Sequence, residues 1–163
     1  MLRSGMARML LVLTMISFTA SLSFAGAKAP QKVKPKDKCP VCGMFVAKYP
    51  NFAAQIQLRD GSVFHFDGNK DLFKCYFDLP RYAPGKKQGD VAAIFVTSYY
   101  DLKPIEARSA YYVIGSDIFG PMGKELIPFP TESEAREFMK DHKGRAVLRF
   151  RDVTRETVNG LDR

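Results

Sequence analysis

The 163-residue chain contains no tryptophan, only two histidines and only three cysteines. A multi-histidine metal site or a disulfide-stapled mini-protein needs more of these residues than the chain supplies. Apart from one N-terminal run, no segment is apolar enough to enter a membrane. No Ser/His/Asp arrangement, phosphate-cradling glycine loop or paired-carboxylate spacing is visible, so the sequence offers no apparatus for hydrolysis. Hydrophobic residues make up 46% and charged residues 26% of the chain, which excludes a disordered or fibrous protein.

The N-terminal run has the features of a targeting segment. Arg3 and Arg8 precede an apolar stretch from Met9 to Ala20, which small residues follow. A basic start, an apolar core of about 7–15 residues and a small-residue site are typical of a secretory signal peptide. We expect residues 1–25 to be removed on export to the periplasm, with an uncleaved anchor as the alternative. Because no cysteine lies near the cleavage site, we expect no lipid anchor. The apolar core is short for a spanning helix, which needs about 20 residues, so we expect no stable membrane insertion of the mature chain.

The rest of the chain divides by composition and periodicity. A Lys/Pro-rich stretch follows the signal and is predicted to be a solvated linker. Its basic residues are not interleaved with aromatic ones, so we expect no nucleic-acid binding. The predicted segments are a signal peptide, a basic linker, a first ββαβ unit, a second ββαβ unit and a polar tail that frays, over residues 1–25, 26–38, 39–104, 105–153 and 154–163.

Periodicity predicts the same order of elements in both units. In the first unit we expect two strands, a helix and a third strand, over residues 54–58, 63–66, 72–77 and 91–97. Asp67 or Asn69 can cap this helix, and Pro80 stops it. The second unit repeats the order over residues 110–115, 125–129, 135–142 and 146–150.

The second unit adds a turn and a helix cap to this pattern. A turn rich in glycine and proline, over 118–124, joins its first two strands. Thr131 and Glu134 form a capping box in which each side chain accepts a free backbone N–H, and Gly144 ends the helix. Units of this size bury little surface alone, so we expect an α+β fold in which the two pack together.

Cys39 and Cys42 are close enough along the chain to bind one metal ion or to form a disulfide. Thiolates and thioethers are soft ligands that favour Cu(I) over zinc, magnesium or calcium. A structural zinc site needs four ligands, and His65 and His142 lie far apart in the sequence. A c-type haem site needs a histidine after the second cysteine, and a thioredoxin-type pair opens a helix. A disulfide between Cys39 and Cys42 is a further alternative in an exported protein, where it would be the resting form of a metal site.

Two methionines, Met44 and Met122, follow no strand or helix period. Met44 comes directly after Cys42–Gly43, and Met122 lies in the sequence Gly-Pro-Met-Gly. Glycine allows a sharp turn that presents the side chain beside it, so both thioethers are candidate soft ligands, with packing onto the core as the alternative. We assign Met139 and Cys75 to the core, because each lies on or beside the apolar face of a predicted helix.

Four motifs together resemble the NosL family of exported copper-binding accessory proteins, which help to assemble nitrous oxide reductase. The resemblance extends from about Lys38 to Phe150. The motifs are Cys39-Pro-Val-Cys-Gly-Met44, Phe64-His-Phe-Asp-Gly68, Ala110-Tyr-Tyr-Val-Ile-Gly-Ser116 and Gly120-Pro-Met-Gly123.

The resemblance implies a fold of two small ββαβ halves, similar to part of the organomercurial lyase. It also implies that Cu(I) is carried by Cys39 or Cys42 together with Met122, and Met44 is a further candidate. Many members of the family are lipid-anchored through a cysteine at the cleavage site, and this sequence lacks that cysteine.

The leading hypothesis is an exported Cu(I) metallochaperone that delivers copper to a periplasmic copper enzyme, nitrous oxide reductase by resemblance, and is not itself an enzyme. Its predicted metal ligands are Cys39, Cys42, Met44 and Met122, binding one Cu(I) per monomer. The alternative is a thiol–disulfide redox protein that uses the same cysteine pair. Two further hypotheses are an organomercurial-cleaving enzyme, suggested by fold analogy alone, and a zinc knuckle that folds only with its metal.

Overall fold

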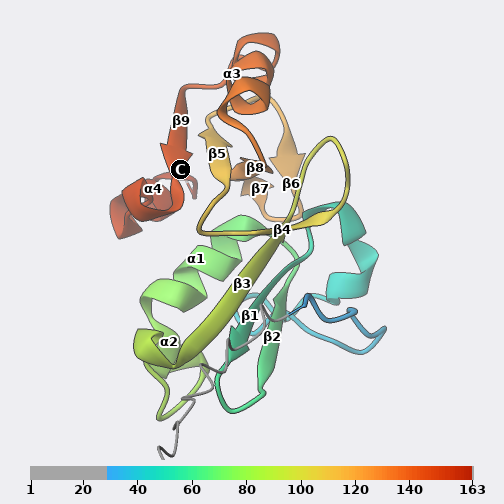
Figure 1. Ribbon diagram of the computed structural model, residues 1–163, viewed down its shortest axis with the longest axis vertical. Coiled ribbons are helices and arrows are strands. Elements are labelled where there is room, and N and C mark those ends of the chain that lie inside the picture. The colour runs from blue at the N-terminus through green and yellow to red at the C-terminus, as the bar shows by residue number, and fades with distance from the viewer. Residues whose placement is uncertain (1–28, 163) are drawn as a thin grey trace, which may run out of the picture.

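Two small antiparallel sheets, each with a helix packed on it, lie one above the other in the computed structural model, which describes residues 29–162 (Figure 1). The predicted signal peptide, residues 1–25, lies outside the described residues. Within 29–162, none of the helices is both long and apolar enough to cross a membrane.

The first sheet has the strand order β2-β1-β3-β4. Its strands are β1 Ala54–Leu58, β2 Val63–Phe66, β3 Val91–Thr97 and β4 Pro104–Glu106, and its helices are α1 Asn69–Phe77 and α2 Leu79–Tyr82. Ile56 in the central strand pairs with Phe64 and Ile94, so apolar residues meet across the sheet. Helix α1 ends at Phe77, before Pro80 as predicted, and Pro80 lies in the first turn of α2, where a missing N–H costs nothing.

The second sheet repeats the arrangement of the first. Its order is β8-β5-β9, so the strand that follows the helix again pairs with the first strand of its unit. The elements are β5 Tyr111–Ile114, the hairpin β6 Phe119–Gly120 and β7 Gly123–Lys124, β8 Ile127–Phe129, α3 Glu132–Asp141 and β9 Ala146–Arg149. Four short 3₁₀ turns are also described, η1 Val46–Lys48, η2 Pro50–Phe52, η3 Gln88–Asp90 and η4 Phe150–Asp152. The predicted α+β class is confirmed.

Helix α3 begins at the predicted cap, although the cap is only half of a capping box. The Thr131 hydroxyl accepts the Glu134 backbone N–H at 3.2 Å, as expected. The Glu134 carboxylate accepts the Thr131 hydroxyl at 3.0 Å instead of a backbone N–H. One of the two predicted contacts is therefore replaced by a contact between the side chains.

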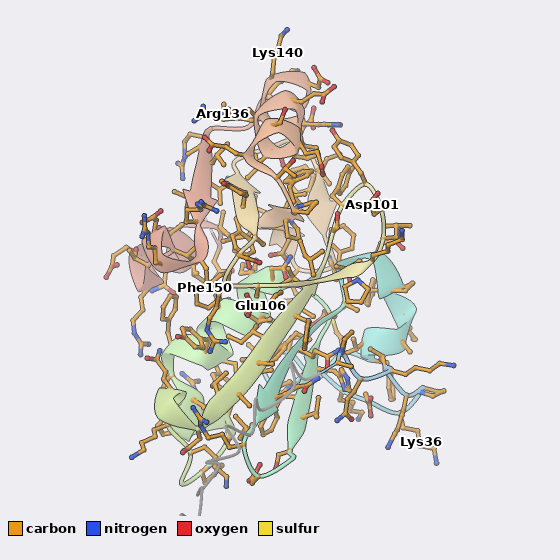
Figure 2. The ribbon with its side chains drawn as sticks, in the orientation of Figure 1. Lys36, Asp101, Glu106, Arg136, Lys140 and Phe150 are labelled. Atoms are coloured by element: carbon orange, nitrogen blue, oxygen red, sulfur yellow. The ribbon has the colours of Figure 1, made fainter. Side chains whose placement is uncertain are left out.

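Aromatic side chains join the two units. Phe73 of α1 lies 5.3 Å from Tyr112 of β5 and 5.0 Å from Phe150 of η4, measured between ring centroids. All three rings belong to one buried cluster with residues of both sheets, and Figure 2 shows Phe150 where the two units meet. The Tyr112 hydroxyl is satisfied inside this cluster because it donates to the Ala107 carbonyl at 2.7 Å.

The two ends of the described chain are more ordered than composition predicts. Most side chains over 29–38 are exposed, as a linker's should be, but Gln31 and Gln55 exchange hydrogen bonds that fasten this segment to β1. The expectation of a frayed tail is wrong, because residues Arg155–Gly160 form helix α4. Val158 and Leu161 are buried where α4 packs against α1.

The interface between the units generates a stability prediction. Phe73→Ala should lower the free energy of unfolding by about 3–5 kcal/mol, because it removes a fully buried ring that both units contact. Phe119→Ala is the matched control, since 61% of that side chain is exposed, and it should change stability by less than about 0.5 kcal/mol. Urea denaturation of the two variants makes the comparison, and equal losses would contradict the packing described.

Candidate metal centre

A tight loop brings the two cysteines of the C-x-x-C motif together. Lys38 and Phe45 form an antiparallel bridge at its base. Inside the loop, Cys39 donates its N–H to the Met44 carbonyl at 2.9 Å, and its own carbonyl accepts the Gly43 N–H at 2.9 Å. Gly43 has φ of +79°, a left-handed conformation that favours glycine. The loop therefore closes through its backbone and leaves both thiols free for side-chain contacts.

Two aspartates near the start of α1 meet the two thiols. Asp67 follows β2, and Asp71 lies in the first turn of the helix. The Cys42 Sγ donates to Asp67 Oδ1 at 3.2 Å, and the Cys39 Sγ donates to Asp71 Oδ2 at 3.3 Å. One ligand atom from each of the four residues lies within 4.8 Å of all the others. We refer to Cys39, Cys42, Asp67 and Asp71 as the cysteine–aspartate cluster.

Burial of the cluster keeps its thiols protonated. Cys39, Asp67 and Asp71 are at most 2% exposed, whereas Cys42 is only partly buried. Burial raises the pKa of the Cys42 thiol to about 11, and the Asp67 carboxylate adds to the rise. The pKa of Cys39 is also raised well above its ordinary value, again by burial first. Thiol–disulfide oxidoreductases need the opposite, a lowered thiol pKa, so this environment disfavours the redox alternative.

The cluster has one polar atom left to satisfy. Asp67 Oδ2 is buried and has no hydrogen-bond partner among residues 29–162. An unsatisfied buried acceptor costs about 1–3 kcal/mol. A cation beside the thiols would offset that cost, and thiolate sulfur is a donor for Cu(I) and for zinc. The residues present therefore fit a bound metal ion.

The start of α1 is held by the second unit, and the predicted helix cap is wrong. Gly68 is the N-cap residue, and neither Asp67 nor Asn69 caps the helix with its side chain. Instead, the Glu125 carboxylate accepts the Lys70 backbone N–H, and Asn69 Nδ2 donates to the Leu126 carbonyl at 2.9 Å. Asp67 is free to face Cys42 because a residue far along the chain supplies the cap.

Glu125 also explains the glycine at the helix start. Its Oε2 lies 2.2 Å from the position that a Cβ on Gly68 would occupy, and 3.1 Å from the corresponding position on Gly120. A larger residue at either position would displace this carboxyl. Burial raises the pKa of Glu125 to about 8, although the N–H groups of Leu126 and Lys70 and the Lys70 ammonium oppose the shift.

The two predicted methionine ligands, Met44 and Met122, differ in their exposure. Lys70 Nζ donates to the Met122 carbonyl at 2.6 Å, so the Gly-Pro-Met-Gly turn lies beside the residue that precedes Asp71. The Met122 side chain is 44% exposed. Met44 is half-buried in the cysteine loop. That either thioether sulfur binds metal stays a prediction.

The third cysteine and the two histidines lie outside the cysteine–aspartate cluster. Cys75 is fully buried in the core, as predicted. His65 Nδ1 pairs with Asp37 Oδ2 at 3.0 Å, and His142 Nδ1 pairs with Asp117 Oδ1 at 3.0 Å. None of these side chains belongs to the cysteine–aspartate cluster.

Asp67 and Asp71 are site residues that were not predicted from the sequence. Asp67 was interpreted only as a helix cap, although it lies in one of the four motifs that carry the NosL resemblance. The four-residue spacing from Asp67 to Asp71 places both near one turn of a helix start, which is the signal that points to them. Their proximity to the cysteines depends on contacts across 25 and 32 residues.

Comparisons with known proteins agree with the motif resemblance. A family model named NosL matches residues 30–158. The "Copper-binding lipoprotein NosL" of Stutzerimonas stutzeri is 29% identical over 126 residues, which cover 76% of this chain and 65% of that protein. The chain thus spans somewhat less than two thirds of that relative's length. The crystal structure of the copper chaperone NosL from Shewanella denitrificans is similar with a TM-score of 0.67 and 26% identity, covering 78% of this chain and 97% of that one.

Glu125 makes the stability of the fold depend on pH. Its carboxyl holds a proton up to about pH 8 when folded, whereas an unfolded glutamate releases it near about pH 4.3. Raising the pH through this window favours the unfolded state. Relative to Glu125→Gln, the wild-type protein should therefore lose about 1 kcal/mol or more of stability between about pH 5 and pH 8.

Urea denaturation at several pH values measures this difference. Glu137→Gln, which changes an exposed glutamate on α3, is the control and should follow the wild-type curve. Parallel curves for wild type and Glu125→Gln would show that the buried carboxyl is not protonated as described.

Proposed function

Because this chain belongs to the NosL family, we propose that it is an exported copper carrier that binds Cu(I) as cargo and catalyses no reaction itself. The observation that carries the proposal is the convergence of Cys39 and Cys42 with two buried carboxylates within 4.8 Å. Two relatives with similar sequence or structure are named as copper-binding or copper-chaperone proteins.

The donor chemistry supports Cu(I) as the cargo. The thiol sulfurs of Cys39 and Cys42 are soft donors, and soft sulfur favours a monovalent copper ion over harder cations. Asp67 and Asp71 each accept a thiol hydrogen bond, so they orient both sulfurs before the metal arrives. Met122 and Met44 would supply thioether sulfur, which completes a soft ligand set without adding charge.

Partial exposure at one ligand suits transfer to another protein. Cys39 is 1% exposed, whereas Cys42 is only partly buried. A partner could approach through Cys42 and displace it while Cys39 still holds the ion. We propose a periplasmic copper enzyme as the recipient, and nitrous oxide reductase is the client that the family resemblance implies. Export follows from the predicted signal peptide over 1–25.

The cysteine pair should be essential for binding copper. Replacing both residues, Cys39→Ser/Cys42→Ser, should abolish stoichiometric Cu(I) binding, because hydroxyl oxygen is a poor donor for this ion. Cys75→Ala is the matched control, since that cysteine is buried outside the cluster, and it should still bind one Cu(I). Titration with Cu(I) against a chromophoric chelator measures both. Unchanged stoichiometry and affinity in the double variant would refute the assignment.

Met122 should strengthen copper binding through its sulfur. Met122→Leu keeps the size and apolar character of the side chain but removes the thioether, so the affinity for Cu(I) should fall about tenfold or more. Met139→Leu, on the core-facing side of α3, should leave it unchanged. Copper-edge absorption spectroscopy of both loaded variants counts the sulfur donors. The same count in Met122→Leu as in the wild type would remove Met122 from the ligand set and leave Met44 as the thioether candidate.

A further inference from the structure

A groove follows the C-terminal half of α1, whereas Asp67 and Asp71 lie at the helix start. It consists of two adjoining hollows of about 580 Å³ and about 300 Å³, and Phe77 lines both. Aromatic side chains, Tyr76, Phe77 and Phe150, form walls of the larger hollow. Figure 2 shows Phe150 beside the junction of the two units. We refer to the two hollows together as the basic groove.

The charge of this groove is almost entirely positive. Six cationic side chains line it, Arg108, Arg149 and Arg151 in the larger hollow and Lys74, Arg81 and Arg155 in the smaller. The only carboxylate among the lining residues of either hollow is that of Asp78. Such a concentration of one sign attracts an anionic partner and orients its approach.

Three of the arginines are held by aromatic rings and not by carboxylates. The guanidinium groups of Arg149, Arg81 and Arg155 lie 3.9, 5.5 and 5.7 Å from the centroids of neighbouring rings. None of the three forms an ion pair with any residue over 29–162. Stacking on a ring positions a guanidinium without neutralising it, so these charges remain available to a ligand.

Two more arginines have only loose carboxylate partners. Arg108 lies 3.6 Å from Glu106, and Arg151 lies 3.7 Å from Asp152, and all four side chains are at least 41% exposed. Exposed pairs of this kind contribute about 0–1 kcal/mol, so an incoming carboxylate can compete for them. Of the six cationic side chains of the groove, only Lys74 has a close carboxylate partner among the described residues, Asp162, at 2.8 Å.

The basic groove extends to the cysteine loop. Val41, which lies between the two cysteines of the motif, lines the smaller hollow. A chain segment bound along the groove would therefore end beside the metal-binding loop. This position would let a partner dock on the α1 side while Cys42 remains available to it.

We propose that the basic groove binds an acidic segment of a partner protein that also carries aromatic side chains. Carboxylates of the segment would pair with the arginines, and its aromatic side chains would pack against the ring-lined walls. A membrane surface fits less well, because the cations line hollows that a flat layer of headgroups does not enter. Docking at this groove requires no metal, so it can be tested on the metal-free protein and fails independently of copper binding.

The test measures binding of a short fluorescein-labelled peptide that alternates glutamate with phenylalanine. Fluorescence anisotropy at low salt should detect binding to wild type, and Arg108→Glu/Arg151→Glu should weaken it about tenfold or more. The control is Arg136→Glu/Lys140→Glu on the outer end of α3 (Figure 2), which changes the net charge equally and should weaken binding less than about twofold. Urea denaturation of each variant, compared with wild type, verifies that the fold is retained.

Each alternative outcome has a definite meaning. Equal weakening in both double variants would overturn the proposal, because binding would then follow net charge alone. A peptide that alternates glutamate with serine should bind more weakly, and equal affinity would remove the aromatic contacts. Binding of wild type to phosphatidylglycerol vesicles but not to the peptide would assign the groove to a membrane and also overturn it. If the double variant misfolds, Arg151→Glu at an 86% exposed side chain decides, with an expected loss of about threefold.

Discussion

Helix α1 begins against a carboxyl group that the other unit supplies. Glu125 accepts the Lys70 backbone N–H, and its second oxygen occupies the space where a side chain at Gly68 would lie. This contact fixes the end of the helix that carries Asp67 and Asp71, and those carboxylates in turn hold the two thiols. All four residues of the cysteine–aspartate cluster therefore belong to the first unit, but their geometry depends on packing between the two units.

Lys70 extends the same dependence to two other segments. Its ammonium group binds the Met122 carbonyl and, at 2.9 Å, Asp162 Oδ1. The Gly-Pro-Met-Gly turn and the residues after α4 thus meet at one side chain that is almost fully buried. Burying an ammonium group costs free energy unless it is paired and hydrogen-bonded, so Lys70 needs these contacts in order to be buried. Burial raises the pKa of both thiols, which disfavours the thiolate that disulfide exchange requires.

Local signals in the sequence predicted the regular elements well, because strand alternation and helix caps are properties of neighbouring residues. They failed where a distant segment changed the local outcome. Asp67 was expected to cap α1, but Glu125 takes that role and leaves Asp67 to Cys42. Helix α4 was missed because its buried residue Val158, with Leu161 directly after the helix, gives no periodic signal over so short a segment, and the helix packs on α1.

The sequence by itself determined the α+β class and the repeated ββαβ order. It also determined that Cys39 and Cys42 lie close together, since they are only three residues apart in a tight loop. Only the tertiary structure decided that Asp67 and Asp71 face those thiols. It also gathered arginines from α2, β9, η4 and α4 around one groove. The reason is physical: hydrogen bonds and charges act through space, and the separations that bring these groups together depend on how the two sheets pack.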